Sequence, residues 1–127
     1  MKRLIKATED IYGMAQVGMI DEYEVFVNTN DGGNIPHFHF RNAKDWRKFH
    51  TCICIDKPEY FHHTGKEDVL NSLMKRKLEE FMRSPVVLSR YKDKFKNNWE
   101  VVCFMWDINN SSMMLSEDLT QPDYRML

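Results

Sequence analysis

The stretch M19-I-D-E-Y-E-V-F-V-N-T-N-D-G-G-N-I-P-H-F-H-F-R41 decides the fold class. Tyr23, Val25 and Val27 occupy every second position, and this period is that of a β-strand. Residues 29–34 tolerate positive φ and predict a turn. Pro36 can open the next strand, because its first position need not donate to the ladder. The stretch therefore predicts an antiparallel hairpin with strands over 19–28 and 36–41.

Two further segments extend this sheet. Residues 15–17 either form an earlier short strand or begin the first one. Residues 42–48 are polar and predict a loop, after which H50-T-C-I-C-I55 alternates again and predicts a strand. We expect these strands to form an antiparallel meander, because each follows its neighbour after a short connection.

A long helix is predicted after the third strand. Thr64 and Glu67 have the spacing of a capping box, which marks a helix start. Apolar residues then recur at spacings of three and four, and Ser84-Pro85 ends the pattern because a residue before proline avoids the helical region. The helix would be about 18 residues long. Its apolar residues are Val69, Leu70, Leu73, Met74, Leu78, Phe81 and Met82.

The remaining chain predicts shorter elements. Residues 88–96 fit a short helix. Residues 99–106 fit either a helix or a buried strand, and we favour the helix because Asn98 can cap it. The sequence thus predicts an α+β fold, a small antiparallel sheet of three or more strands with one long helix and one or two shorter helices on one face. We expect a single domain over 1–127, with an ordered core over about 14–110 and an irregular acidic tail over 111–127.

Composition narrows the class of protein. The chain has 127 residues, of which 43% are apolar and 13% aromatic, so it can build a packed core. The net charge of −1 argues against a nucleic-acid-binding protein. No apolar run is long enough to span a membrane, and M1-K-R-L-I-K-A-T-E-D10 does not have the pattern of a signal peptide. We therefore expect a cytoplasmic protein with three free thiols, at Cys52, Cys54 and Cys103.

All five histidines fall between residues 37 and 63. His37 and His39 project to one face of their strand, and Phe38 and Phe40 to the opposite, core face. Two imidazoles on one strand suit a divalent metal such as Zn²⁺. His50, on the next strand, and the pair His62-His63, before the helix, could converge on them, with Glu59 or Asp56 as a carboxylate ligand.

Three other interpretations of the cluster remain open. H37-F-H-F-R41 begins like the motif of histidine-triad nucleotide hydrolases but has Arg41 in place of the third histidine, and H62-H-T64 matches one half of the motif of two-histidine phosphoesterases. Cys52 or Cys54 beside His39 or His50 could form a nucleophilic pair. The imidazoles could also only stabilise the hairpin through hydrogen bonds, since neutral histidine both donates and accepts.

Two surfaces are candidates for binding a partner. Trp46 stands in the polar run K44-D-W-R-K48, and an exposed tryptophan is a typical contact residue of an interface. The segment 66–96 holds nine basic and five acidic residues. Lys75, Arg76 and Arg83 on the predicted helix could contact an acidic partner, although such a run is commonly a solvated helix face.

The pattern also resembles a family of short bacterial proteins of unknown function. E24-V-F-V-N28, the turn, I35-P-H-F-H39, a third strand, a capped helix and a tryptophan-bearing last element carry the resemblance, over residues 22–106. That family has N-E-x-x-P-P-H-x-H after a strand, whereas this chain has Ile35 and Asn34 in the preceding positions. The family often lies beside a partner gene in toxin–antitoxin-like loci, and the chain also looks like small proteins of phages and mobile elements. The resemblance implies an α+β domain and a protein partner, and it supplies no catalytic residues.

Two hypotheses follow. The first is a non-enzymatic interaction protein of toxin–antitoxin or mobile-element type. It would bind a protein partner, or itself, through the histidine-bearing sheet face or the basic helix. The second is a metal-binding protein or metal-dependent hydrolase acting on phosphate esters, built on His37, His39, His50, His62 and His63.

Overall fold

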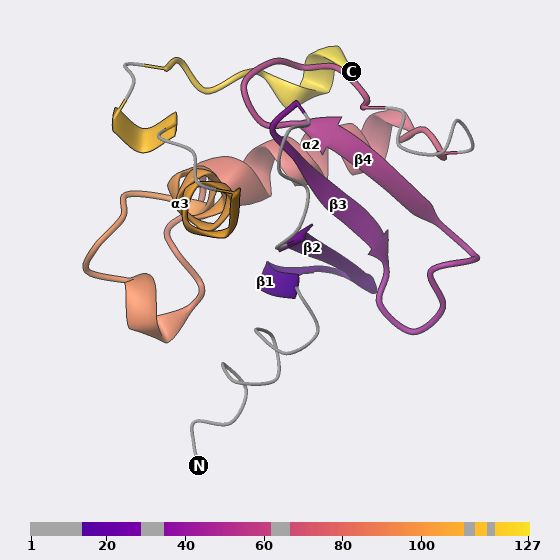
Figure 1. The fold of residues 1–127 in the computed structure, drawn as a ribbon. Coiled ribbons are helices and arrows are strands. Elements are labelled where there is room, and N and C mark those ends of the chain that lie inside the picture. The colour runs from indigo at the N-terminus through magenta and orange to yellow at the C-terminus, as the bar shows by residue number, and fades with distance from the viewer. Residues whose placement is uncertain (1–13, 29–34, 62–66, 111–113, 117–118) are drawn as a thin grey trace.

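The computed structural model describes residues 14–28, 35–61, 67–110, 114–116 and 119–127. Four antiparallel strands form one sheet in the order of the sequence, β1 (Met14–Ile20), β2 (Tyr23–Asn28), β3 (His37–Asn42) and β4 (His50–Cys54). Two helices, α2 (Ser72–Arg83) and α3 (Asn98–Asn110), follow the sheet (Figure 1). The predicted α+β fold with an antiparallel meander is confirmed.

The first predicted strand is divided in two. Asp21 has φ 54°, in the left-handed region, and the pairs Ile20↔Tyr23 and Met19↔Glu24 close a two-residue hairpin around Asp21 and Glu22. Aspartate tolerates this conformation because its short polar side chain can bond locally. The expectation of one strand over 19–28 is therefore wrong, and the alternative of an earlier strand around 15–17 is confirmed as β1, which lies at the edge of the sheet. The turn predicted at 29–34 lies outside the described residues.

The register between β2, β3 and β4 sorts the side chains into two faces. Val25 pairs with Phe40, and Phe38 pairs with Ile53, so these apolar residues share one face. The other face carries Phe26, His39 and Cys52 on three neighbouring strands. The predicted alternation of histidine and phenylalanine is confirmed, but the histidine face is as buried as the phenylalanine face in β3.

Helix α2 begins eight residues after the predicted cap. Asn71 is its N-cap and accepts a hydrogen bond from the Met74 amide. The preceding residues cannot join the helix, because the Asp68 amide donates to the His50 carbonyl and the Leu70 amide to the Tyr60 hydroxyl. The prediction of a helix of about 18 residues from the capping box is wrong. The predicted stop at Ser84 is confirmed.

After α2, the described part of the chain contains one α-helix, α3. In the predicted helix over 88–96, only Ser89–Tyr91 is helical, as a single 3₁₀ turn, η1. Residues 99–106 belong to α3, as favoured, and the Asn97 side chain accepts from the Glu100 amide at its start. The Asn98 side chain instead bridges α2 and the next segment, donating to the Phe81 carbonyl and accepting from the Val87 amide.

The C-terminal segment packs into the core. It carries two 3₁₀ turns, η2 (Met114–Ser116) and η3 (Tyr124–Met126). Tyr124 is fully buried, its ring meets Phe38 at 5.7 Å, and its hydroxyl donates to the Ile55 carbonyl at 2.9 Å. Lys75 Nζ donates to the Leu127 carbonyl at 3.0 Å, which ties η3 to α2. Although the sequence predicted an irregular tail, its last residues contribute a central core side chain.

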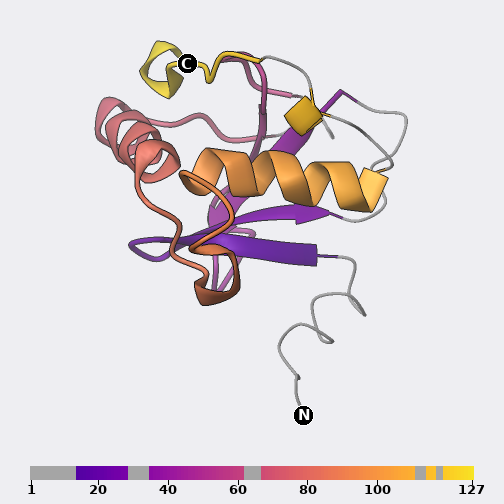
Figure 2. The same ribbon diagram turned by 90° about the vertical axis from the view of Figure 1, so that its left-hand side faces the viewer.

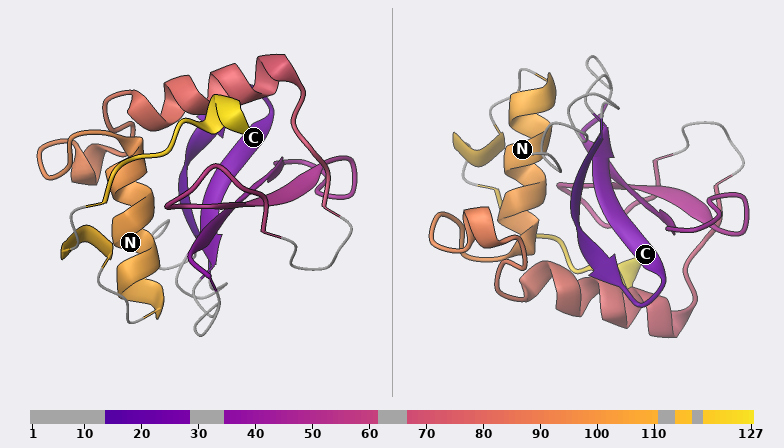
Figure 3. Two further views of the ribbon diagram at one scale, coloured as in Figure 1. Left: turned by 90° about the horizontal axis from the view of Figure 1, so that it is seen from above. Right: turned by 90° about the horizontal axis from the view of Figure 1, so that it is seen from below.

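The two helices pack against each other and contribute buried side chains to one apolar core with the sheet. Figure 2 shows α3 lying along β1 and β2, and Figure 3 shows α2 crossing α3 at a steep angle, with the C-terminal segment beside both. Trp99 on α3 donates from Nε1 to the Ile55 carbonyl, the same oxygen that Tyr124 contacts. None of the helices in the described ranges has both the length and the apolar character that a membrane span requires.

A candidate metal centre on two neighbouring strands

Three side chains from β3 and β4 bring metal-binding atoms together. His37, His39 and Cys52 each place one such atom within 4.8 Å of those of the other two. All three are buried, with 0%, 4% and 0% of their surface exposed. The grouping follows from the strand geometry, because His37 and His39 are two residues apart on β3 and His39 is paired directly with Cys52 on β4.

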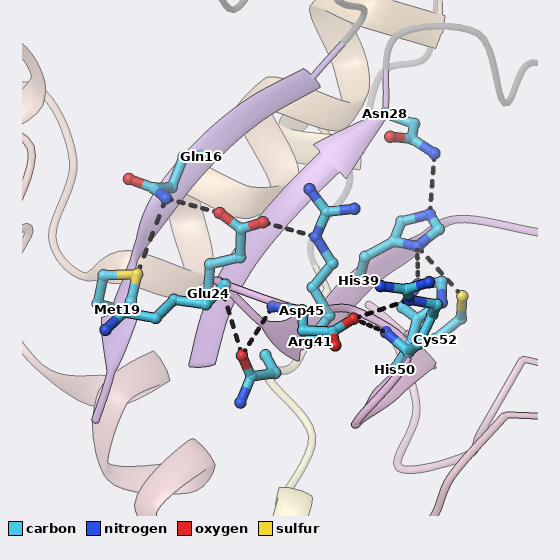
Figure 4. Close-up of polar contacts among 12 residues, drawn as sticks. Gln16, Met19, Glu24, Asn28, His39, Arg41, Asp45, His50 and Cys52 are labelled. Atoms are coloured by element: carbon cyan, nitrogen blue, oxygen red, sulfur yellow. Dashed lines mark hydrogen bonds and ion pairs between the residues drawn. The ribbon is translucent and has the colours of Figure 1, made fainter. Parts of the chain in front are cut away.

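His39 is the centre of the group. Its Nδ1 lies 3.4 Å from Cys52 Sγ and 2.9 Å from His50 Nε2, and the Asn28 amide donates to its Nε2 at 3.1 Å (Figure 4). In this arrangement Nδ1 carries the proton and donates to His50. If the Asn28 amide is turned, its oxygen accepts from Nε2–H instead, and Nδ1 presents a lone pair toward Cys52.

His37 has a defined tautomer. Its Nδ1 lies 2.8 Å from the Ile35 carbonyl, which can only accept, so Nδ1 carries the proton and Nε2 the lone pair. A histidine that binds a metal commonly donates its second ring nitrogen to a backbone carbonyl in this way. Phe61 and Trp106 hold the ring in place, with ring centroids 4.3 Å and 5.3 Å from that of His37. His37 is therefore oriented as a ligand through Nε2.

The distances from His39 indicate different roles for Cys52 and His50. With Zn–N about 2.0–2.1 Å and Zn–S about 2.3 Å, a tetrahedral ion holds two nitrogens about 3.4 Å apart and a nitrogen and a sulfur about 3.6 Å apart. The His39–Cys52 distance of 3.4 Å is close to the second value. The His39–His50 distance of 2.9 Å is that of a hydrogen bond. Cys52 thus fits as a ligand, and His50 as a hydrogen-bond partner of one.

A polar network lies beside the group on the same sheet face. Phe26 stacks on His39 at 4.7 Å, and the Arg41 guanidinium lies 4.4 Å from the centre of the Phe26 ring. Arg41 Nε donates to Glu24 Oε1 at 2.6 Å, and Gln16 donates to Glu24 Oε2 at 2.8 Å (Figure 4). Glu24 therefore has both oxygens engaged, which makes it a partner of Arg41 rather than a metal ligand.

The predicted ligands are only partly brought together. His37 and His39 belong to the group, while His50 touches it through His39. His62 and His63 lie outside the described residues. Asp56 and Glu59 are exposed and are not members of the group.

The predicted nucleophile Cys52 contacts a histidine, but it is buried. Cys52 and His39 are within reach of each other at 3.4 Å, yet Cys52 is completely buried, so a substrate cannot approach its sulfur. Cys54 lies on the same face of the sheet as Cys52, two residues later on β4, and is paired with His37. Burial raises the pKa of the Cys54 thiol, and the nearby Lys57 partly opposes that rise. All three cysteines are free thiols, as expected.

The predicted partner-binding residues have different environments. Trp46 is 56% exposed, and its ring stands edge-on to that of His50 at 6.3 Å. Arg76 is exposed on α2. Lys75 and Arg83 instead make contacts within the chain, Lys75 with the Leu127 carbonyl and Arg83 with Glu79.

Sequence reasoning treated Cys52 only as a nucleophile and missed it as a member of the group that could hold a metal ion. The signal was present, because H-x-H on one strand and C-x-C on the next place two histidines opposite two cysteines once the register is known. The length of the loop between the strands does not by itself give that register. Reading the two three-residue patterns together would have found Cys52 as a candidate ligand.

Comparison with known proteins finds no match for this chain. The chain matches no family model, no curated protein and no solved structure. The resemblance to short bacterial proteins with a Pro-His-x-His motif therefore stays a prediction. A buried group of two histidines and one cysteine that could hold a metal ion is what the site itself provides.

Proposed function

We propose that this chain is a metal-binding protein that holds a divalent cation, Zn²⁺ in the first place, between β3 and β4. The observation that supports it most strongly is the convergence of donor atoms of His37, His39 and Cys52 within 4.8 Å of one another. Imidazole nitrogen and thiolate sulfur are the usual ligands of zinc, whereas magnesium and calcium take oxygen. The proposed cation therefore belongs to the group of zinc and related transition metals.

Burial favours a structural over a catalytic role. A catalytic zinc ion keeps one position open for water or substrate, and a structural one is closed by protein ligands. The three side chains here are at most 4% exposed. A bound ion would join β3 to β4, and its binding free energy would add to the stability of the folded chain. The hydrolase alternative requires an open position, which this burial does not favour.

Binding requires one local rearrangement. His39 would present Nδ1 to the ion and lose its hydrogen bond to His50. Asn28 would turn its amide so that Oδ1 accepts from Nε2–H, and this retains the contact at 3.1 Å. His37 needs no such change, because its Nδ1 already donates to the Ile35 carbonyl.

The test is metal content and metal-dependent stability of the purified protein. Wild type should contain about one zinc per chain or take it up after treatment with a chelator, and at 100 times Kd the ion should add about 2.7 kcal/mol to the free energy of unfolding. Cys52→Ser should lose both effects. Cys103→Ser is the matched control, because Cys103 is 1% exposed and lies on α3, outside the group.

Two outcomes of that test would contradict the proposal or its assignment to these residues. A wild type that takes up neither Zn²⁺ nor Co²⁺, Ni²⁺ or Cu²⁺ after reduction of its thiols would contradict the proposal. Uptake that Cys103→Ser abolishes and Cys52→Ser retains would contradict the assignment of the site.

We propose partner binding through Trp46 as a second function, on a separate observation. Trp46 is the most exposed aromatic side chain among the described residues, and tryptophan is enriched in interface contacts. Self-association is the simplest form to test. Wild type and Trp46→Ala should differ in sedimentation across a concentration series, and Ile108→Ala, which alters an equally exposed side chain at 58%, should not. Identical sedimentation of all three as monomers would reject self-association through Trp46.

A further inference from the structure

The register of β3 and β4 places a second cysteine beside the proposed metal. His39 is paired with Cys52, and His37 is paired with Cys54, so the two rungs form a square of two histidines and two cysteines. Side chains of directly paired residues point to the same face of the sheet. Cys54 is 2% exposed, so its thiol is enclosed with the others.

We propose that Cys54 is the fourth ligand, which makes the centre a tetrahedral Cys₂His₂ site formed by one hairpin. This inference rests on the proposed metal-binding function. Cys54 is not among the three residues whose donor atoms already lie within 4.8 Å of one another. A change of its χ1 between staggered positions moves the sulfur by about 3 Å without moving the backbone. The fourth ligand therefore closes on the ion by a side-chain rotation.

Charge favours Cys54 over His50 in this position. A divalent ion held by Cys52 thiolate and neutral imidazoles leaves one net positive charge inside a site whose ligands are buried. An uncompensated buried charge is strongly unfavourable. A second thiolate makes the centre neutral, whereas His50 would leave the charge unchanged.

The distances agree with this choice. His50 Nε2 lies 2.9 Å from His39 Nδ1, which is a hydrogen-bond distance and shorter than the about 3.4 Å between two nitrogen ligands of zinc. In Figure 4 His50 approaches His39 from the side away from Asn28. His50 is also half-buried at the first position of β4, one rung beyond the square.

Cobalt substitution tests the inference, because Co²⁺ takes the place of Zn²⁺ and its thiolate charge-transfer band grows with each bound sulfur. The intact chain loaded with Co²⁺ should show the band intensity of two thiolates and the visible spectrum of a tetrahedral ion. Cys54→Ser should reduce the band by about half, Cys52→Ser should abolish binding, and Cys103→Ser should leave the band unchanged. Zinc-edge absorption spectroscopy on the wild type gives an independent count and should find two sulfur and two nitrogen ligands.

The experiment distinguishes a failure of the Cys54 assignment from a failure of the metal-binding function. Wild-type binding with one sulfur, unchanged in Cys54→Ser and lost in His50→Ala, would overturn the role of Cys54 and leave the metal-binding function intact. No binding of Co²⁺ or Zn²⁺ by the wild type would overturn both. Because the wild-type spectra alone count the sulfurs, a Cys54→Ser chain that does not fold would not prevent the decision.

Discussion

Replacing Tyr124 tests how far the C-terminal segment belongs to the core. The side chain is fully buried, its ring contacts Phe38, and its hydroxyl donates to the Ile55 carbonyl at 2.9 Å. Burial raises the pKa of this hydroxyl well above its usual value, so it stays protonated and remains a donor. The two parts of the side chain, ring and hydroxyl, can be removed separately.

Tyr124→Phe removes the hydroxyl alone. The Ile55 carbonyl keeps its hydrogen bond from Trp99 Nε1 at 2.9 Å, so no buried acceptor is left unsatisfied. The expected loss is that of one net hydrogen bond, about 1 kcal/mol. Tyr124→Ala also removes the ring and leaves a cavity, for which large aromatic truncations typically cost about 3–5 kcal/mol.

Urea unfolding followed by tryptophan fluorescence measures both losses, with thermal unfolding as a check at about 4 °C per kcal/mol for a chain of this size. Met126→Ala, in the same turn but 71% exposed, should change the free energy of unfolding by less than about 0.5 kcal/mol. A Tyr124→Ala loss below about 1 kcal/mol would refute the reasoning, because it would mean that the ring is not part of the core.

Three further predictions concern other parts of the chain. Gly18→Ala should destabilise the protein by about 1–3 kcal/mol in urea unfolding, because the added Cβ would lie 2.8 Å from the Phe81 ring. The bonds from Arg125 lower the pKa of Asp123 to about 2 from 3.8, so this carboxylate stabilises the fold above pH 3.8 and loses that effect as the pH falls through about 2. The stability difference between wild type and Asp123→Asn should therefore be present at pH 7 and shrink between about pH 4 and pH 2. Burial raises the pKa of the Cys103 thiol, so this thiol should react with a disulfide reagent only as fast as the chain unfolds. Prompt reaction of native Cys52→Ser/Cys54→Ser, in which Cys103 is the remaining thiol, would contradict that expectation.

The fold class was predictable because each strand pairs with its neighbour in the sequence. The alternation in β2, β3 and β4 is local and strong, and short connections between such strands lead to a meander. The division of the first strand was not predictable from periodicity alone. Asp21 and Glu22 continue the polar pattern of a strand edge, and only the φ of 54° at Asp21 marks the turn.

The error in α2 has a tertiary cause. The capping-box pattern at Thr64 is a local signal, but the stretch before the helix is held by bonds from Asp68 and Leu70 to residues 50 and 60. Such contacts override helix propensity, and no local pattern contains them. Asn71, the observed cap, has the residue type of a cap but no acidic residue three positions later to announce it.

The candidate metal centre shows the same limit. Sequence reasoning found His37 and His39 because two residues on one strand define their own spacing. Cys52 required the register across β3 and β4, which depends on how the loop closes. The burial of the histidine face also depends on Phe61 and Trp106, which come from distant parts of the chain.

The proposed ligands all belong to one hairpin, and this has a consequence for the order of folding. β3 and β4 are adjacent in sequence and in the sheet, so their pairing is a local, rapidly formed contact. The contact between Tyr124 and the Ile55 carbonyl, by contrast, joins residues that are far apart in the sequence. Because the hairpin precedes both helices in the sequence, an ion captured there would fix the register of the sheet first. The metal would then act as a template for the later packing of α2, α3 and the C-terminal segment.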